Sequence, residues 1–148
     1  MKKSIIISSV LVAVIAVVSS FQSREIIVIT RDNFEGQVEL QAAKKFTSLD
    51  KVITYNHLTI VVEHNQGIHF IDMTNPQSPV KESFLQVPGC QDVAVKNGLI
   101  LVRSAVDLVV FDLQTKLELH RQRNVFESDY DTGDVVIPEG SIVLRSSI

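Results

Sequence analysis

The chain has a single cysteine, and this shortage decides how it can be stabilised. Because Cys90 stands alone, no intramolecular disulfide can form, and stability must come from a packed core. Cys90 follows Gly89 at the expected entrance of a strand, which predicts a small buried side chain that fills space. The alternatives for this residue are an intermolecular disulfide or a reactive thiol.

Basic clusters and catalytic motifs are also missing. The formal net charge is −3, and the only local basic cluster, His120-Arg-Gln-Arg123, is too short to predict more than a solvated turn. Polyanion binding needs clustered Lys and Arg, so no nucleic-acid partner is expected. The sequence has no Gly-rich phosphate loop, Gly-x-Ser-x-Gly elbow, His-Glu-x-x-His or Cys-x-x-Cys motif, so no motif points to an enzyme class.

The N-terminus has the pattern of an export signal. Lys2 and Lys3 precede an apolar run over residues 5–18, and Ser19 and Ser20 offer small residues for cleavage. The run of roughly 15 residues is shorter than the roughly 20 that span a bilayer, so cleavage is expected and a membrane anchor is the alternative. No cysteine follows the run, which does not support a lipid anchor. The mature chain of about 128 residues is then one exported domain with more acidic than basic side chains.

An internal repeat is the most informative pattern that is present. Residues 92–105 align with residues 134–147 at a spacing of 42, sharing Asp, Val, Gly, Ile, Arg and Ser. At a spacing of 40, residues 53–62 align with 93–102 and residues 68–72 with 108–112. Such units predict an all-β, β-propeller-like repeat with about three incomplete blades of short antiparallel strands. Propellers host many different functions, so the predicted fold does not predict an activity.

Short β-branched runs bounded by turn residues predict the individual strands. These are residues 52–55, 58–63, 68–72, 80–85, 93–95, 99–103, 107–112, 135–137 and 141–144. Unbroken apolar runs at residues 59–62 and 99–102 predict sheets that are covered on both faces. The only stretch rich in helix formers, residues 38–46, has little apolar face at helical spacing.

Turn residues predict the connections between these strands. Asn56-His57 and Asn97-Gly98 stand between apolar runs and predict tight hairpins, because Asn and Gly tolerate positive φ angles. Glu139-Gly140 predicts a tight hairpin in the third unit, less strongly than Asn97-Gly98 does in the second. Asn65-Gln66-Gly67 predicts a further hairpin, and residues 74–79 predict a longer connection fixed by proline.

The repeat divides the chain into a signal peptide at residues 1–20, an N-terminal segment at 21–51 and a propeller repeat region at 52–148. The third unit stops at Ile148, before a counterpart of residues 108–112, which predicts that its last strand is missing. Either the chain is a truncated or degenerate copy, or residues 25–29 supply a closing strand, with Asp32 lying 40 residues before Asp72. Open edge strands would pair with another chain, so a homodimer that closes a larger ring is a further hypothesis.

Three segments carry a resemblance to a known family. They are Gly67-Ile-His-Phe-Ile-Asp-Met-Thr-Asn-Pro-Gln-Ser-Pro79, Val87-Pro-Gly-Cys-Gln-Asp-Val-Ala-Val-Lys-Asn-Gly98 and Val106-Asp-Leu-Val-Val-Phe-Asp112. Over residues 49–113 the chain resembles the LVIVD-repeat β-propeller proteins, which are exported bacterial proteins of Bacteroidetes-type cell envelopes. The resemblance implies a location in the periplasm, the outer membrane or the cell surface, with no established enzymatic activity and no catalytic residues to carry over.

The chain departs from the pattern of that family in two respects. The second unit has Leu113-Gln-Thr-Lys-Leu117 where an Asn-Pro turn should stand. Members of the family are usually considerably longer and start with a lipoprotein cysteine. Both departures bear on whether the repeat is complete.

Histidines and carboxylates are further side chains that could carry chemistry. His57, Glu63, His64 and His69 form the densest group of metal-ligand types, but Glu63 and His64 should point to opposite faces of a strand. Solvated turn and strand-surface histidines are therefore the expected interpretation, with a zinc site as the alternative.

Aspartates recur at equivalent places in the units. Asp72 and Asp112 end equivalent strands, where a carboxylate can accept backbone N–H bonds of the next turn, so a structural role is expected in place of a paired-carboxylate active site. Asp92 and Asp134 precede strands in the same role. Residues 127–134 alternate oxygen ligands but lack EF-hand spacing, which favours a solvated linker over a calcium loop.

These patterns predict no catalytic residue, no metal and no cofactor. The predicted function is a non-catalytic interaction or scaffold module that presents Asn56-His57, residues 64–67 and residues 74–79 to a protein or glycan at the bacterial envelope. One alternative is a propeller hydrolase or lyase acting on envelope glycans, with Asp72 and Asp107 as the first suspects. The other is a fragment of a longer propeller protein without independent function.

Overall fold

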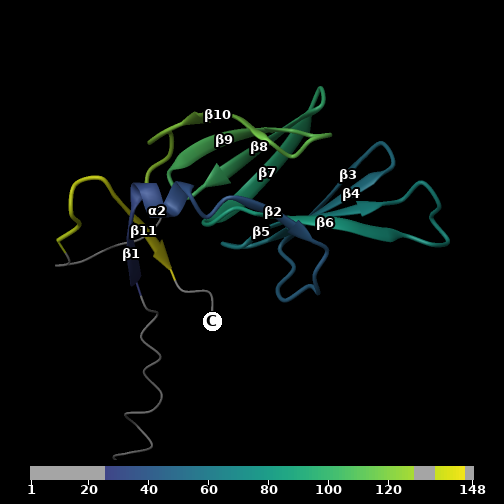
Figure 1. Ribbon diagram of the computed structural model, residues 1–148, viewed down its shortest axis with the longest axis horizontal. Helices are drawn as coiled ribbons and strands as arrows, with labels where there is room; N and C mark the ends of the chain where they lie inside the picture. Colours follow the sequence, from purple (N-terminus) through teal and green to yellow (C-terminus); the bar gives the residue numbers. More distant parts are fainter. Residues whose placement is uncertain (1–25, 129–135, 146–148) are drawn as a thin grey trace, which may run out of the picture.

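The computed structural model describes residues 26–128 and 136–145, and these residues form an almost entirely β structure (Figure 1). Within these ranges eleven strands form three antiparallel sheets, and one short helix, α2 (Arg31–Glu35), follows the first strand. The all-β expectation is confirmed. In this part of the chain no helix combines the length and the apolar character needed to cross a membrane. The expected signal peptide lies outside the described residues.

The first sheet is an up-and-down meander with one additional edge strand. In chain order it contains β2 (Glu39–Ala42), β3 (Lys51–Tyr55), β4 (Leu58–Glu63), β5 (Gly67–Asp72) and β6 (Val80–Gln86). Strands β3 to β6 pair with their chain neighbours, and β2 pairs with the far side of β6. β2 lies in the stretch that is rich in helix formers, so pairing with β6 overrides the local helix propensity there.

The second sheet repeats the meander. It contains β7 (Cys90–Lys96), β8 (Leu99–Ser104), β9 (Asp107–Asp112) and β10 (Glu118–Gln122) in spatial order. Strands β3 to β6 and strands β7 to β10 thus each form a run of four antiparallel strands that pair with their chain neighbours. The expectation of a solvated turn at the basic cluster is wrong for His120, Arg121 and Gln122. These residues belong to β10 and pair with β9, beyond a bulge between Glu118 and His120.

Asparagines in the left-handed conformation close the predicted hairpins. Asn56 (φ 54°) and Asn97 (φ 50°) stand in the two-residue turns of β3–β4 and β7–β8, and Asn65 (φ 63°) stands in the β4–β5 turn. The short polar side chain of Asn tolerates this conformation better than most residues do. The three hairpin predictions are confirmed, and a longer connection joins β5 to β6 as expected.

The third sheet is a ribbon of two strands from opposite ends of the chain. β1 (Ile26–Thr30) pairs antiparallel with β11 (Ser141–Arg145), so the N-terminal segment does supply a strand to the third unit. Thr30 lies opposite Ser141, and Asp32 lies in α2, so Asp32 does not end a strand as Asp72 does. The expected strand at residues 135–137 is not present at Val136 and Ile137, and the first of its residues lies outside the described ranges.

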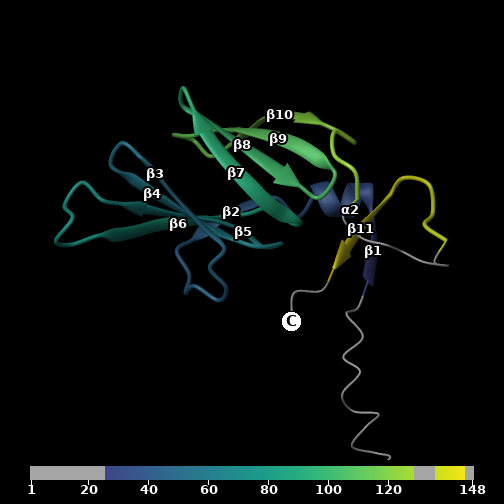
Figure 2. The same ribbon diagram turned by 180° about the vertical axis from the view of Figure 1, so that it is seen from behind.

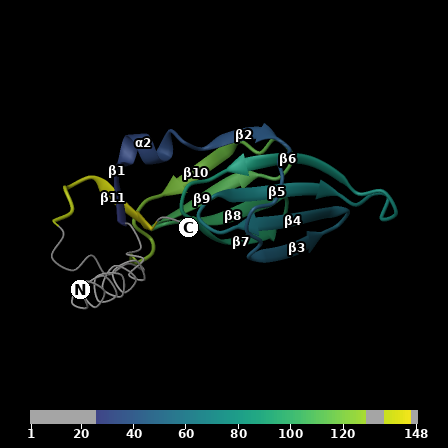
Figure 3. The same cartoon turned by 90° about the horizontal axis from the view of Figure 1, so that it is seen from below.

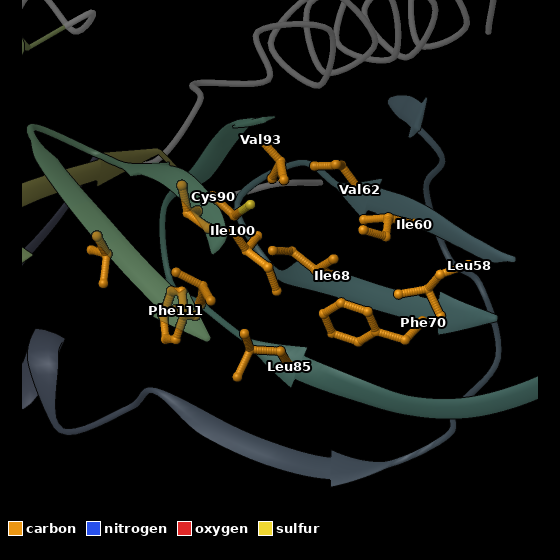
Figure 4. Close-up of a cluster of buried hydrophobic side chains, with 13 residues drawn as sticks. Leu58, Ile60, Val62, Ile68, Phe70, Leu85, Cys90, Val93, Ile100 and Phe111 are labelled. Carbon is orange, nitrogen blue, oxygen red and sulfur yellow. The ribbon is translucent and has the colours of Figure 1, made fainter. Parts of the chain in front are cut away.

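The first and second sheets stack face to face (Figure 3), and their buried apolar side chains form the main core (Figure 4). The first sheet contributes Leu58, Ile60, Val62, Ile68, Phe70 and Leu85, and the second contributes Val93, Ile100, Val102, Val109 and Phe111. Burial on both faces is confirmed for β4, where Ile60, Val61 and Val62 are all buried, whereas burial alternates along β8.

The two sheets meet through opposite faces of equivalent strands. Tyr55–Leu58 and Lys96–Leu99 are the last pairs before equal two-residue turns, so Leu58 and Leu99 are equivalent positions. Leu58 faces the main core, whereas Leu99 does not belong to it. The turns therefore repeat at a spacing of 41, although the core positions of β4 and β8 repeat at 40. A shift of one residue moves a strand's side chains to the other face.

The ribbon and α2 lie together beside the stacked sheets (Figure 2). Phe34 of α2, Ala105 and Ile142 are buried in a second, smaller core, with Leu144 packed against it. Gly89 belongs to the same contact, since a Cβ there would lie 3.0 Å from both Ala105 and Leu144. The ribbon therefore packs on the β8–β9 turn and not on the outer face of the second sheet.

Candidate functional site

The β3–β4 and β7–β8 turns lie at the same end of the two stacked sheets (Figure 1). Residues of both turns line a groove of about 600 Å³ between the sheets. The β9–β10 connection and β6 complete its walls. Its polar lining consists of Tyr55, Asn56, His57, Glu82, Asn97, Asp112, Gln114 and Lys116. The β3–β4 and β7–β8 turns thus bring amide and imidazole groups to one opening, where Glu82 and Asp112 add carboxylates. Of the three loops predicted as interaction surfaces, only Asn56-His57 lines this groove.

Lys116 holds one wall of the groove in place. Its ammonium group donates to the carbonyl groups of Leu113 and Gln114 and lies 4.6 Å from the centroid of the Phe70 ring. Burial lowers the pKa of Lys116, against the opposing effect of Glu82 and Asp112. The sequence marked this stretch only as a departure from the Asn-Pro turn, and the ammonium group fixes the conformation that replaces that turn.

Asp112 and Asp72 both cap the turn that follows their strand, as predicted. Asp112 Oδ1 accepts hydrogen bonds from the backbone N–H groups of Thr115 (2.7 Å) and Gln114 (2.9 Å). Asp72 Oδ1 accepts from the Thr74 hydroxyl (2.6 Å) and the Thr74 N–H (2.8 Å). These bonds lower the pKa of both carboxyl groups. Repetition of Asp at this place therefore has a structural cause.

Asp107 lies in a different cluster, where it joins the N-terminal segment to the second sheet. Its carboxylate is fully buried, and Oδ2 accepts from Arg31 (2.7 Å) and Arg121 (3.3 Å). Oδ1 accepts from the backbone N–H of Asn124 (3.0 Å). The sequence indicated Asp107 only as a candidate acid and gave no sign of these partners, which lie on α2, on β10 and beyond it.

Glu35 extends the same cluster on the side of α2. Arg123 donates two hydrogen bonds of 2.8 Å to its carboxylate, and Arg31 lies 3.3 Å from Oε1. The hydrogen bond from Arg123 and the other nearby guanidinium groups hold the pKa of Glu35 below its usual value, although burial opposes this. The basic stretch that looked solvated in the sequence thus ties α2 to the edge of the second sheet.

The four side chains considered as metal-ligand types lie in three places, and the expectation of solvated histidines is wrong for His69, which is 1% exposed. Glu63 and His69 meet in the interior, with Glu63 Oε1 3.3 Å from His69 Nε2. His64 Nδ1 lies 3.6 Å from Asp50 at the surface, and His57 lines the groove. Within residues 26–128 and 136–145, no three His, Cys, Asp or Glu side chains gather as a metal site would require.

Asp92 holds the two sheets together at their edges. Its Oδ1 atom accepts from Lys51 Nζ on β3 (2.6 Å) and from the N–H of Val93 (2.8 Å). Asp92 lies inside β7 and not before it. Asp134 and most of the acidic stretch at residues 127–134 lie outside the described residues.

Cys90 is a buried space-filler, as predicted. Its side chain belongs to the main core and has no exposed surface, and burial raises the pKa of the thiol to about 12. Because the thiolate is the reactive form, we expect a thiol reagent such as DTNB to leave the native protein unmodified. In concentrated guanidinium chloride it should label one thiol per chain. Stoichiometric labelling of the native protein would contradict this prediction.

No family model, curated protein or solved structure matches this chain.

Proposed function

We propose that this chain is an exported, non-catalytic interaction module of propeller-like repeats, and that it binds an oligosaccharide of the bacterial envelope in the groove between the two sheets. The groove carries this proposal, because equivalent turns of both repeats contribute its polar side chains. Loops held by a rigid scaffold are the usual place for binding residues.

The arrangement of the two sheets supports the propeller-like part of the proposal. Strands β3 to β6 of the first sheet and strands β7 to β10 of the second each form a four-stranded meander in chain order, and residues 87–89 alone connect β6 to β7. Repeat units that stack in series must meet through opposite faces, since a contact between identical faces would end the series after two units. Leu58 and Leu99 meet this condition, because they are equivalent positions and only Leu58 faces the main core. The resemblance to the LVIVD-repeat proteins supports export and an envelope location.

The chemistry of the groove favours an oligosaccharide as the ligand. Hydroxyl-rich sugars need both donors and acceptors, and the amides of Asn56, Asn97 and Gln114 offer both. Tyr55 adds an aromatic ring with a hydroxyl group beside the apolar side chain of Leu58. A groove that is open to solvent suits an extended ligand that binds along the surface.

The carboxylates suspected of catalysis are engaged elsewhere. Asp107 binds two guanidinium groups, and Asp72 binds Thr74. A glycosidase needs one carboxyl group whose pKa is raised so that it can act as an acid. The hydrogen bonds from Thr74 shift the pKa of Asp72 the other way. This contrast favours binding over turnover.

Two glycine substitutions test the proposal without disturbing the turns. Asn56→Gly and Asn97→Gly together remove two groove amides, while Gly keeps the positive φ that both positions require. Asn65→Gly is the matched control, since Asn65 has the same conformation outside the groove. Soluble peptidoglycan fragments and lipopolysaccharide-derived oligosaccharides serve as probes in titration calorimetry. We expect the double variant to lose roughly tenfold or more in affinity, at about 1 kcal/mol for each amide.

The outcomes separate the alternatives. Equal affinity in the double variant would place the ligand outside the groove and overturn the proposed site. Release of cleaved sugar from any probe would favour the hydrolase or lyase. Binding to a random peptide library, with none of the glycans bound, would replace the oligosaccharide with a protein partner.

A further inference from the structure

A carboxylate and an imidazole lie together in the interior of the first sheet without serving the groove. Glu63 has no exposed surface and His69 is 1% exposed. Glu63 Oε1 is 3.3 Å from His69 Nε2, yet neither Glu63 Oε2 nor His69 Nε2 has a hydrogen-bond partner among the described residues. Buried polar atoms without partners are costly, so this pair is a weak point in a folded interior.

One segment covers this pair, and we call residues 43–50 the cap segment. Glu63 Oε1 accepts hydrogen bonds from the backbone N–H groups of Thr47 and Ser48, both within the cap segment. The Thr47 hydroxyl accepts from Gln66 Nε2 (3.1 Å). Phe46 places its ring edge on His69, with 4.7 Å between the ring centroids. At its end the backbone N–H of Asp50 donates to the carbonyl group of Val62 (3.0 Å), so polar bonds and aromatic contacts hold the cap segment on the sheet.

The His69 imidazole contacts two phenylalanine rings, and a lysine ammonium group lies over each of these rings. On the side of β6, the centroid of the Phe84 ring lies 4.6 Å from that of the His69 ring. Lys44 Nζ lies 3.6 Å from the centroid of the Phe84 ring. Lys81 Nζ stands 3.6 Å from the centroid of the Phe46 ring. The charged groups near His69 are thus Glu63 from β4, Lys81 from β6 and Lys44 from the cap segment. The exposed pair of Asp50 and His64 lies where the cap segment meets β3.

We propose that the cap segment is an acid-sensitive latch, in which protonation of His69 releases residues 43–50 from the outer face of the first sheet. A protonated imidazole would gain the attraction of Glu63 Oε1 at 3.3 Å, but it would be a third cation beside two ammonium groups, with almost no access to water. Opening of the cap segment gives that charge solvent at the cost of the contacts of Phe46, Thr47 and Ser48.

The direction of the effect follows from the two titrating groups. Burial lowers the pKa of His69 below its ordinary value of 6.5, aided by Lys44 and Lys81 and opposed by Glu63. The closed form therefore binds fewer protons than the open form, and it loses stability as the pH falls through 6.5 towards the lowered pKa. Burial raises the pKa of Glu63, but the N–H of Thr47 and the imidazole outweigh this, so a second loss begins below 4.5.

The face that the latch uncovers is a packing face. Val61, His69 and Phe84 share it, since Val61 lies opposite His69 and His69 lies opposite Phe84 in the register. Equivalent strands of the second sheet use the corresponding face to contact the first sheet, as the opposition of Leu58 and Leu99 shows. Release of the cap segment therefore exposes a surface built to receive another sheet.

Amide hydrogen exchange tests the latch directly. In the wild-type chain, we expect protection of the Thr47 amide, corrected for its intrinsic exchange rate, to fall about tenfold between pH 7 and about pH 5. His69→Phe keeps an aromatic ring between Phe46 and Phe84 but cannot be protonated, so its protection should not change over this range. His64→Gln is the control and should behave like the wild type.

Two results would overturn the latch. The first is protection of Thr47 that stays constant or increases on acidification, which would mean that protonation strengthens the contact with Glu63. The second is an equal loss of protection in His69→Phe. If that variant does not fold, the wild type decides alone, because a latch must release the Thr47 amide at a higher pH than the Val102 amide of the second sheet.

Discussion

Asp107→Ala is expected to lower the free energy of unfolding by about 3–5 kcal/mol. The carboxylate is fully buried and compensates two guanidinium groups, of which Arg121 has only 7% of its side chain exposed and Arg31 only 15%. Without Asp107, Arg31 keeps the partly exposed Glu35 and Arg121 keeps the partly exposed Glu118. Both guanidinium groups lose their buried counter-charge, which costs far more than the loss of an exposed ion pair. The same carboxylate orders Asn124 and anchors α2, so the N-terminal segment should loosen as well.

Equilibrium denaturation in guanidinium chloride measures this effect, with Lys51→Ala as the control. Lys51 also forms an ion pair with an aspartate, but the side chains of Lys51 and Asp92 are 47% and 64% exposed. Its loss should cost no more than about 1 kcal/mol. If both variants cost the same small amount, Asp107 does not anchor the N-terminal segment.

Gly67→Ala is expected to destabilise the protein by about 4 kcal/mol or more, because no side chain fits at this position. Gly67 begins β5 with φ 150°, and a Cβ there would lie 2.2 Å from the carbonyl oxygen of Leu85 and 2.9 Å from the Phe84 ring. The Leu85 oxygen is backbone and cannot move away without breaking the pairing of β5 with β6. The substitution therefore forces apart the centre of the first sheet.

Gly98→Ala separates this steric effect from backbone strain. Gly98 also has a positive φ, 76°, but a Cβ there would meet nothing within 4 Å. We expect it to cost only about 1 kcal/mol, the usual penalty for an L-residue in the left-handed region. Thermal unfolding followed by circular dichroism gives both values. Similar costs for the two variants would contradict the close packing at Gly67.

Local chemistry made much of the fold predictable from the sequence. Asn56 and Asn97 identified their hairpins because few other residues tolerate a left-handed turn. Asp72 and Asp112 were expected to bind the next turn, and they do, since a carboxylate reaches N–H groups two or three residues ahead. Burial of Cys90 was predicted from its place after Gly89 at the entrance of a strand. In each case the relevant partner lies close in the chain.

The features that the sequence did not predict depend on distant partners. β2 and β10 are edge strands with polar side chains, so their hydrophobic patterns are weak, and pairing with β6 and β9 alone makes them strands. The groove combines turns about 40 residues apart with the β9–β10 connection. Arg31 lies 76 residues from Asp107, and nothing local in the sequence relates them.

The shift in register between β4 and β8 is a further feature that the sequence did not predict. Aligning apolar residues gives a spacing of 40 for β4 and β8, which places their core positions together. The turns show that equivalent positions are 41 apart, because the β4–β5 turn is one residue longer than the β8–β9 turn. Hydrophobicity alone cannot detect this shift, since both faces of these strands carry apolar residues.

We propose that ligands bind in the groove between the two sheets and are not transformed there. Amide chemical-shift mapping of residues 21–148, with soluble peptidoglycan fragments as the titrant, tests both parts of this proposal in one sample. We predict that shift changes concentrate at His57, Gly98 and Gln114, while the signals of the sugar keep their intensities over days. Shift changes at β1 and β11 without change in the groove would contradict binding in the groove. New signals from cleaved sugar would contradict binding without turnover.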